Sequence, residues 1–181
     1  MPELNVTLAQ ALRWTEWLFA LSLAIQTLEY LRMRHATDET GLWAWSLQRR
    51  DVPVAWVRRC LDVLFAPAVH QAHLWLRLCA AAVLAFSGGS LALVWFLFAG
   101  NVLILIRWRG AFNGGSDFLT LVVLTGLVIV YSVGAGMDAE LGTRAGLWYI
   151  CIQSMTSYFM SGAVKLLRPE WRSGRAMTIF L

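Results

Sequence analysis

The chain has 181 residues, of which 59% are hydrophobic and 14% are charged, and its formal net charge is +4. This composition excludes an ordinary soluble globular protein. It predicts a single all-α, polytopic integral-membrane domain of about five transmembrane helices. Ten tryptophans suit aromatic belts at two membrane interfaces. The three cysteines are scattered, without the spacing of a zinc site or a disulfide framework.

The first predicted span covers residues 12–31 and contains polar side chains that need partners or water. Glu16 and Glu29 lie near its opposite ends, where we expect water to reach them. Gln26 is more central. Because an unpaired amide is costly in hydrocarbon, we expect Gln26 to bond to a neighbouring helix.

Residues 32–71 are too polar to cross a membrane, because they carry several arginines interleaved with tryptophans. Residues 42–48 and 54–65 are predicted to form short helices in the headgroup layer, with tryptophan inserted and arginine reaching lipid phosphates. Basic residues among aromatics also occur in nucleic-acid binding. The flanking spans instead favour membrane lipids as the partner, and no nucleic acid.

His70 and His73 stand just before the second predicted span, residues 72–87. On one helix face they could ligate a metal, haem or pigment, but no carboxylate or cysteine stands near enough in sequence to complete a site. We therefore interpret them as interfacial histidines, and the sequence predicts no metal site. Arg77 lies one turn inside the span and must pair or extend to the interface.

Residues 87–90, Ser-Gly-Gly-Ser, are typical of a tight turn, because glycine allows positive φ. The third predicted span covers residues 90–106. A single helix over 74–106 would be roughly 50 Å long, whereas a bilayer core is about 30 Å thick. The two apolar segments are therefore predicted to form a helical hairpin.

A loop with a strong turn signal precedes the fourth predicted span, residues 117–134. The residues that carry this signal are Asn113, Gly114 and Gly115. Asp117, or the serine before it, is expected to cap the exposed N–H groups at the start of the span. A short loop then leads to the fifth predicted span, residues 144–167.

The fifth span carries a polar stripe along one face of an otherwise apolar helix. Its members are Ser154, Tyr158, Ser161, Gly162 and Lys165, the last being the only lysine of the chain. Because unpaired polar groups are costly in hydrocarbon, the stripe should face other helices or a wet cavity. Helix packing is the favoured interpretation, and a site with Lys165 at its mouth is the alternative.

The basic residues predict an orientation in the membrane. With five spans, one side would carry only Arg13 and Arg144. The other side would carry Arg32, Arg34, Arg49, Arg50, Arg58, Arg59, Arg107, Arg109, Lys165, Arg168, Arg172 and Arg175. By the positive-inside rule, the N-terminus is outside and the C-terminus cytoplasmic, and we expect a bacterial cytoplasmic (inner) membrane.

The ordered set of motifs in residues 107–177 resembles a known family. It consists of Asn113-Gly114-Gly115-Ser116-Asp117, then Gln153, Tyr158, Gly162, Lys165-Leu166, Trp171 and Gly174. This pattern is similar to that of the horizontally transferred transmembrane (HTTM) domain of vitamin K-dependent gamma-carboxylases and their bacterial relatives. The first three spans resemble the family only in their layout.

The resemblance implies a ligand-binding role for a set of residues on the fifth span and after it. These are Gln153, Tyr158, Gly162, Lys165 and Trp171. In the carboxylases, a lysine in the position resembling Lys165 is implicated in reduced-quinone chemistry. A lysine that acts as a base must lose its proton, and Arg168 and Arg172 would favour that loss. The carboxylases continue through further membrane helices and a large extramembrane domain, so the resemblance implies the family more than carboxylation.

Two functions of different classes follow as hypotheses. The first is a non-catalytic accessory or structural subunit of a larger membrane complex, which could hold lipid or quinone between its helices. The second is a carboxylase-like or quinone-linked membrane enzyme that uses Lys165. A transporter or channel is disfavoured, because no predicted span carries a central run of ionisable groups.

Overall fold

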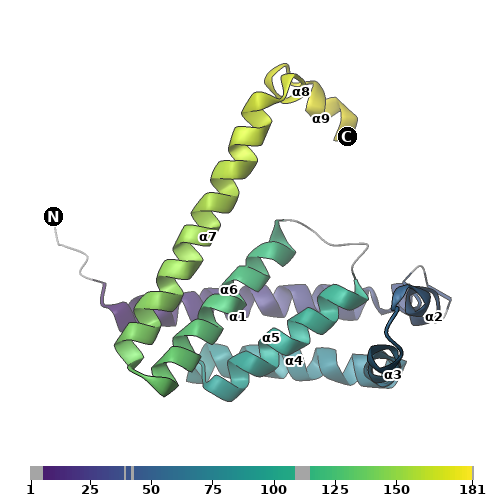
Figure 1. The fold of residues 1–181 in the computed structure, drawn as a ribbon, viewed down its shortest axis with the longest axis horizontal. Helices are drawn as coiled ribbons and strands as arrows, with labels where there is room; N and C mark the ends of the chain where they lie inside the picture. The colour runs from purple at the N-terminus through teal and green to yellow at the C-terminus, as the bar shows by residue number, and fades with distance from the viewer. Residues whose placement is uncertain (1–5, 39, 42, 109–114, 181) are drawn as a thin grey trace.

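The computed structural model describes residues 6–38, 40–41, 43–108 and 115–180. Within these ranges every regular element is helical, which confirms the predicted all-α class (Figure 1). The chain folds back and forth as a set of long helices, with short helices at one end of the body and at the C-terminus.

Each predicted span coincides with a long helix over most of its length. These helices are α1 (Leu8–Arg32), α4 (Pro67–Ser87), α5 (Leu91–Arg107), α6 (Ser116–Gly136) and α7 (Ala139–Leu167). Two of them, α4 and α6, are long and apolar enough to cross a membrane, and α5 is apolar but shorter. By length and composition, the part of the chain that is described thus contains two candidate membrane spans rather than the five expected.

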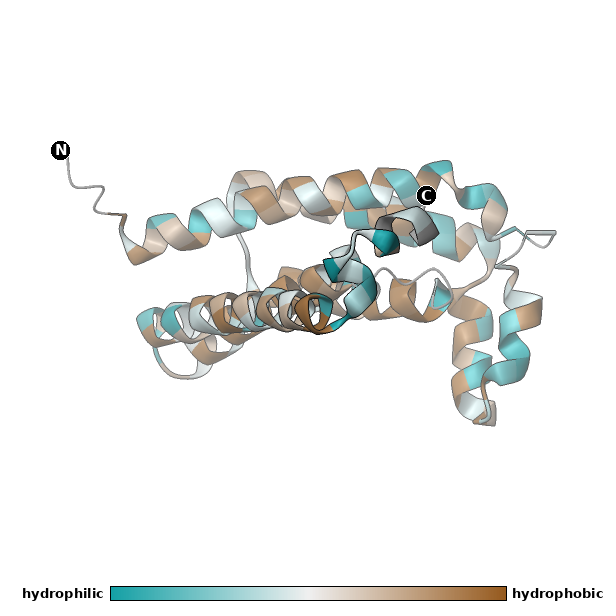
Figure 2. Cartoon of the chain, turned by 90° about the horizontal axis from the view of Figure 1, so that it is seen from above, coloured by the Kyte–Doolittle hydropathy of each residue, from teal (hydrophilic) through white to brown (hydrophobic). Residues whose placement is uncertain are grey.

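The segment between α1 and α4 contains the two short helices expected there. α2 (Trp45–Gln48) and α3 (Ala55–Leu64) are flanked by the 3₁₀ turns η1 (Arg34–Ala36) and η2 (Arg49–Asp51). After α7 come α8 (Pro169–Arg172) and α9 (Arg175–Phe180). Hydrophilic residues gather at the end of the body that holds α2 and α3 (Figure 2).

The core of the body lies where α1, α4, α5 and α6 meet. It is made by Phe19, Ala20, Leu23, Ala80, Ala81, Leu84, Val94, Leu97, Leu124 and Leu127. These side chains are apolar, and they recur at helical spacing along each helix, so each helix presents one apolar stripe to the others. This core fixes the relative positions of α1 and α6, which form the walls of the cavity described below.

The turn between α4 and α5 is confirmed, and it binds a carboxylate that was expected in water. Gly88 has a φ of 84°, a conformation that favours glycine. The N–H of Gly89 donates to Glu16 Oε1 at 2.9 Å, and the Tyr131 hydroxyl donates to the same oxygen. Glu16 is only 1% exposed and pairs with Arg13 at 2.9 Å. The expectation of a water-exposed Glu16 was therefore wrong, whereas Glu29 is exposed.

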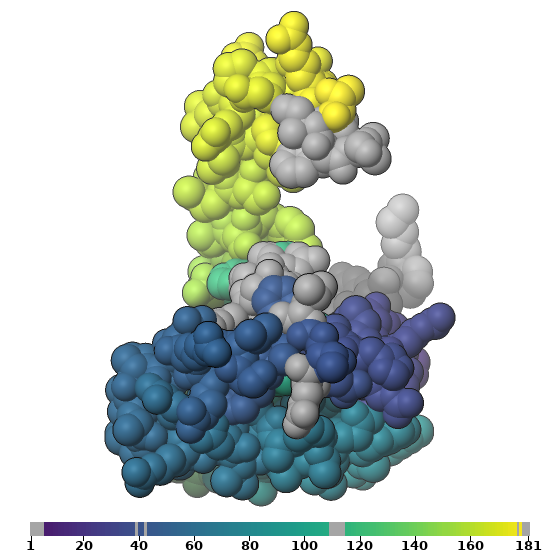
Figure 3. Space-filling view, turned by 90° about the vertical axis from the view of Figure 1, so that its right-hand side faces the viewer, coloured from purple at the N-terminus to yellow at the C-terminus, as the bar shows by residue number. Residues whose placement is uncertain are grey.

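The first half of α7 packs closely on α6 through glycines. A Cβ at Gly146 would collide with the Gly126 carbonyl and with Val130, and one at Gly142 would collide with the Val130 carbonyl and the Gly134 backbone. Gly142 and Gly146 are four residues apart, the spacing that lets two helix backbones approach. The second half of α7 and the helices after it stand clear of the body (Figures 1 and 3).

Candidate functional site

A buried arginine lies at the centre of a polar network that joins four helices. Arg77 of α4 is 1% exposed. Its guanidinium donates to Gln26 Oε1 at 2.6 Å, Thr27 Oγ1 at 3.1 Å and Asn101 Oδ1 at 3.2 Å. It also lies 5.9 Å from the centre of the Tyr30 ring. Of the two expected outcomes for Arg77, pairing or extension to the interface, the structure shows pairing, with partners on α1 and α5.

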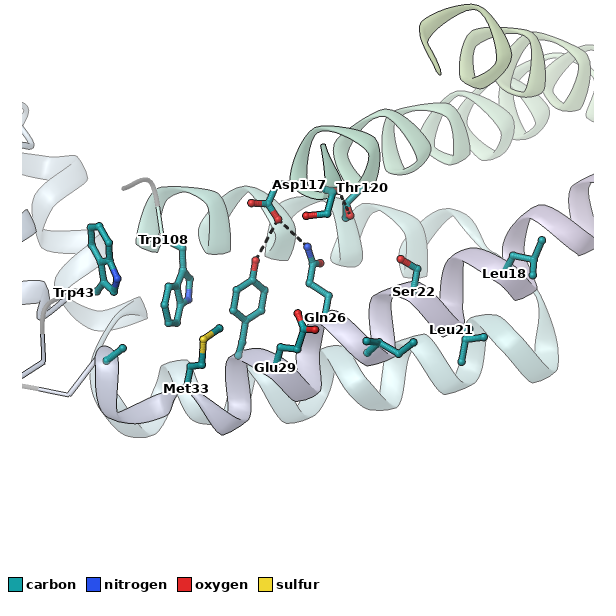
Figure 4. A pocket seen from close by; sticks show the side chains of 14 residues that line it. Leu18, Leu21, Ser22, Gln26, Glu29, Met33, Trp43, Trp108, Asp117 and Thr120 are labelled. Atoms are coloured by element: carbon teal, nitrogen blue, oxygen red, sulfur yellow. Dashed lines mark hydrogen bonds between the residues drawn. The ribbon is translucent and has the colours of Figure 1, made fainter. Parts of the chain in front are cut away.

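The network continues from α1 to a carboxylate on α6. Gln26 Nε2 donates to Asp117 Oδ1 at 2.9 Å, and the Tyr30 hydroxyl donates to the same oxygen at 3.4 Å (Figure 4). Gln26 therefore bonds to neighbouring helices on both sides, as expected. Because its amide accepts from Arg77 and donates to Asp117, it connects a buried cation with a buried anion.

The structure places Asp117 one position inside the start of α6. α6 begins at Ser116, and its N-cap is Gly115, which has a φ of −85° and no side chain that could cap. Asp117 lies inside the first turn and directs its carboxylate toward α1. A negative charge in this turn still interacts favourably with the helix dipole. Asn113 and Gly114, the other predicted turn residues, lie outside the described residues.

A cavity of about 640 Å³ lies between α1 and α6, next to this network. One end is polar and aromatic, with Glu29, Tyr30, Trp43, Trp108 and Asp117 in its wall. Figure 4 shows Trp43 and Trp108 at that end and Leu18 and Leu21 at the other. The rings of Tyr30 and Trp108 are 5.3 Å apart. The cavity can therefore hold a molecule with one polar and one apolar part.

The ligand-binding residues implied by the family resemblance lie elsewhere. Gln153, Tyr158 and Gly162 are on the half of α7 that stands away from the body, and Tyr158 is 67% exposed. A Cβ at Gly162 would meet open space. Of the predicted set, the structure brings together Lys165 and Trp171, whose ring centre lies 4.8 Å from the lysine Nζ.

His70 and His73 share one side of α4, with ring centres 6.4 Å apart. His70 was expected at an interface, but it is 5% exposed and is covered by Phe65. His73 faces Gly100 of α5. No group of three or more residues that could hold a metal ion occurs among the residues the structure describes.

A second buried arginine attaches the segment after α1 to the end of α5. Arg107 donates to the Thr37 carbonyl at 2.7 Å and to the Trp43 carbonyl, and it accepts from Gln48 at 3.0 Å through its own carbonyl. This places Trp43 against the cavity. Farther out, the hydrogen bond from Arg49 lowers the pKa of Asp62, and a bond from Trp45 adds to the effect.

Sequence reasoning found some members of this site and missed others. Gln26 and Arg77 stood out because each is a strongly polar residue inside an apolar stretch. Thr27, Asn101 and Trp108 were missed, although Asn101 is an amide within an equally apolar stretch and carries the same signal.

No protein-family model, curated protein or solved structure matches the chain. The resemblance to the HTTM family therefore stays a prediction.

Proposed function

We propose that the chain is an HTTM-like, non-catalytic subunit of a membrane complex, and that it docks on another integral membrane protein through the second half of α7. In this proposal all five long helices cross a bacterial inner membrane, with the N-terminus outside and the C-terminus in the cytoplasm. Catalysis by Lys165 in a quinone-linked enzyme is the alternative.

The arrangement of charges supports this orientation. The C-terminal ends of α1 and α5 lie at the same end of the body as α2 and α3, and the turns after α4 and α6 lie at the opposite end (Figure 1). The first end carries Arg32, Arg34, Arg49, Arg50, Arg58, Arg59 and Arg107. A membrane protein with its basic end in the cytoplasm obeys the positive-inside rule.

The observation that carries the proposal is the exposure of the second half of α7. Its large apolar side chains are exposed, including Phe159 at 73% and Leu167 at 81%. The space-filling view shows this part of the chain clear of the body (Figure 3). No hydrogen bond joins the side chains of Ser154, Tyr158 or Ser161 to another helix in the part of the chain that the structure describes.

The polar stripe indicates what should cover this half of α7. Lipid tails can cover its apolar side chains, but they cannot pair with serine and tyrosine hydroxyls. A helix of another protein can do so, because small and hydroxylated residues let two backbones approach and exchange hydrogen bonds. A partner helix on the face of Ser154, Tyr158 and Ser161 therefore fits this surface better than lipid alone.

Position-specific photo-crosslinking in native membranes tests this docking. A benzophenone amino acid placed at Ser154, Tyr158 or Ser161 should give one protein adduct of constant size. The same probe at Met155, Phe159 or Leu166, on a neighbouring apolar face, should give mainly lipid adducts. Adducts of the same protein at equal yield from both sets, or lipid adducts alone from both, would contradict a docking face.

The position of Lys165 favours an anchor over a base. Its ammonium lies over the Trp171 ring, 4.8 Å from the ring centre, and the face of an indole attracts a cation. Lys165→Arg should therefore preserve the amount of assembled complex and its biological activity, because arginine keeps the charge and stacks on the ring. Lys165→Glu should weaken assembly. The measurement is complex yield after affinity purification, together with a growth phenotype.

The same substitution also tests the alternative that the chain is an enzyme. Guanidinium does not release its proton in proteins, so Lys165→Arg would eliminate a lysine base and lower the rate by about 10²–10⁴. A Lys165→Arg variant that assembles normally but loses all activity would therefore support the quinone-linked enzyme and exclude the anchor.

A further inference from the structure

We propose that the space between α1 and α6 binds one phospholipid with an amine-bearing, zwitterionic head, such as phosphatidylethanolamine. This inference rests on the membrane insertion in the proposed function, and it is independent of docking through α7. The head would occupy the polar, aromatic end of the cavity, and one acyl chain would follow the groove between the two helices.

The shape of the space suits a head joined to a chain. The cavity of about 640 Å³ adjoins a second one of about 510 Å³, and the two share wall residues. The shared residues are Leu18, Ser22, Ser116 and Thr120. The second cavity extends along α1 and α6 past Phe19, Leu119 and Val123. Together they form one groove, polar at one end and mainly apolar at the other.

The polar end favours a cation. Glu29 is exposed at the rim, and its carboxylate makes no hydrogen bond or ion pair within the part of the chain that is described. Asp117 adds a second carboxylate to the wall. Trp43 supplies an aromatic ring of the kind on which ammonium groups are bound, whereas Tyr30 and Trp108 are buried with their rings against each other.

The same end also offers a donor that needs an acceptor. Trp108 is 5% exposed, and its Nε1 is buried without a hydrogen-bond partner. Figure 4 shows this nitrogen on the side of the ring toward Met33, another residue of the cavity wall. A buried donor left unpaired is costly, so an oxygen of a ligand would be stabilised here.

These two features together select a zwitterion. A purely anionic head would be repelled by Glu29 and Asp117, and a purely cationic head would leave the Trp108 donor unpaired. A phosphoethanolamine head has an ammonium group and phosphate oxygens within one short segment. The depth of the head in the membrane also fits. Trp108 is the C-cap of α5 and Trp43 directly precedes the N-cap of α2, and these elements meet at the end of the body that the proposed topology places at the cytoplasmic interface.

Native mass spectrometry of the purified full chain tests the site. Protein in detergent is mixed with equal amounts of dioleoyl phosphatidylethanolamine and dioleoyl phosphatidylglycerol. We expect one molecule of the ethanolamine lipid to stay bound at a collisional activation energy that removes the glycerol lipid. Glu29→Gln removes the negative charge and keeps the shape of the side chain, and Trp108→Phe removes the indole N–H donor together with part of the ring. Each should weaken retention about tenfold. Glu140→Gln and Trp56→Phe, exposed and outside the groove, are the matched controls.

The outcomes separate this site from the proposed function. Equal retention of both lipids, or retention unchanged in Glu29→Gln and Trp108→Phe variants that melt like wild type, would overturn the site. Normal docking through α7 in that case would leave the proposed function intact. Specific ethanolamine-lipid binding without any docking partner would support the site and count only against docking.

Discussion

Arg77→Met is expected to destabilise the folded chain by about 3–5 kcal/mol, the cost typical of removing one partner from a buried charged network. The substitution leaves the side-chain oxygens of Gln26, Thr27 and Asn101 without their donor. It also removes a positive charge that interacts electrostatically with Asp117. The effect is measured as the melting temperature of the detergent-solubilised protein. Melting is monitored by the loss of the monodisperse peak in size-exclusion chromatography after heating.

Arg59→Met is the matched control, because Arg59 is exposed on α3 and the same change there removes no buried contact. It should alter the melting temperature little. The double variant Arg77→Met, Asp117→Asn should lose less stability than the two single changes added together, because it neutralises both ends of the network. Strict additivity would show that Arg77 and Asp117 are not coupled through Gln26.

The double variant Gly142→Ala, Gly146→Ala is expected to separate α7 from α6. Each new Cβ would meet backbone atoms of α6, which cannot rotate away as a flexible side chain can. Overpacking of this kind costs about 1–3 kcal/mol at each position. The measurement is the melting temperature, combined with protease sensitivity of the turn at residues 137–138, which should rise.

Gly136→Ala is the control for this pair. It lies at the end of α6, a Cβ there would meet nothing within 4 Å, and alanine has the higher helix propensity. Its stability should equal or exceed that of wild type. If the double variant at positions 142 and 146 melted like this control, the close packing of α6 on α7 would be refuted.

The sequence predicts the helices well and their partners poorly. Hydrophobic stretches locate each long helix within a few residues, because an apolar segment of that length has few alternatives to a helix. The same pattern does not say which polar residues pair. Glu16 was expected in water, yet it binds Gly89 and Tyr131, residues that only folding brings to the start of α1.

The candidate site shows the same limit. Motif spacing along one helix drew attention to Tyr158 and Lys165, which are close in sequence. The groove is built instead from α1 and α6, where Gln26 and Asp117 are 91 positions apart. Their approach depends on how the helices pack, which the spacing of motifs does not contain. Gly142 and Gly146 did carry a readable signal, since their four-residue spacing is typical of closely packed membrane helices.

Cysteine accessibility in intact cells tests the membrane topology most directly. With Cys60, Cys79 and Cys151 replaced by serine, single cysteines are introduced at Asp38 and Met137, on opposite ends of the body. The five-span arrangement predicts that a membrane-impermeant maleimide labels position 137 from outside and labels position 38 only after permeabilisation. Labelling of position 38 alone, or of both positions in intact cells, would contradict the arrangement on which the proposed function rests.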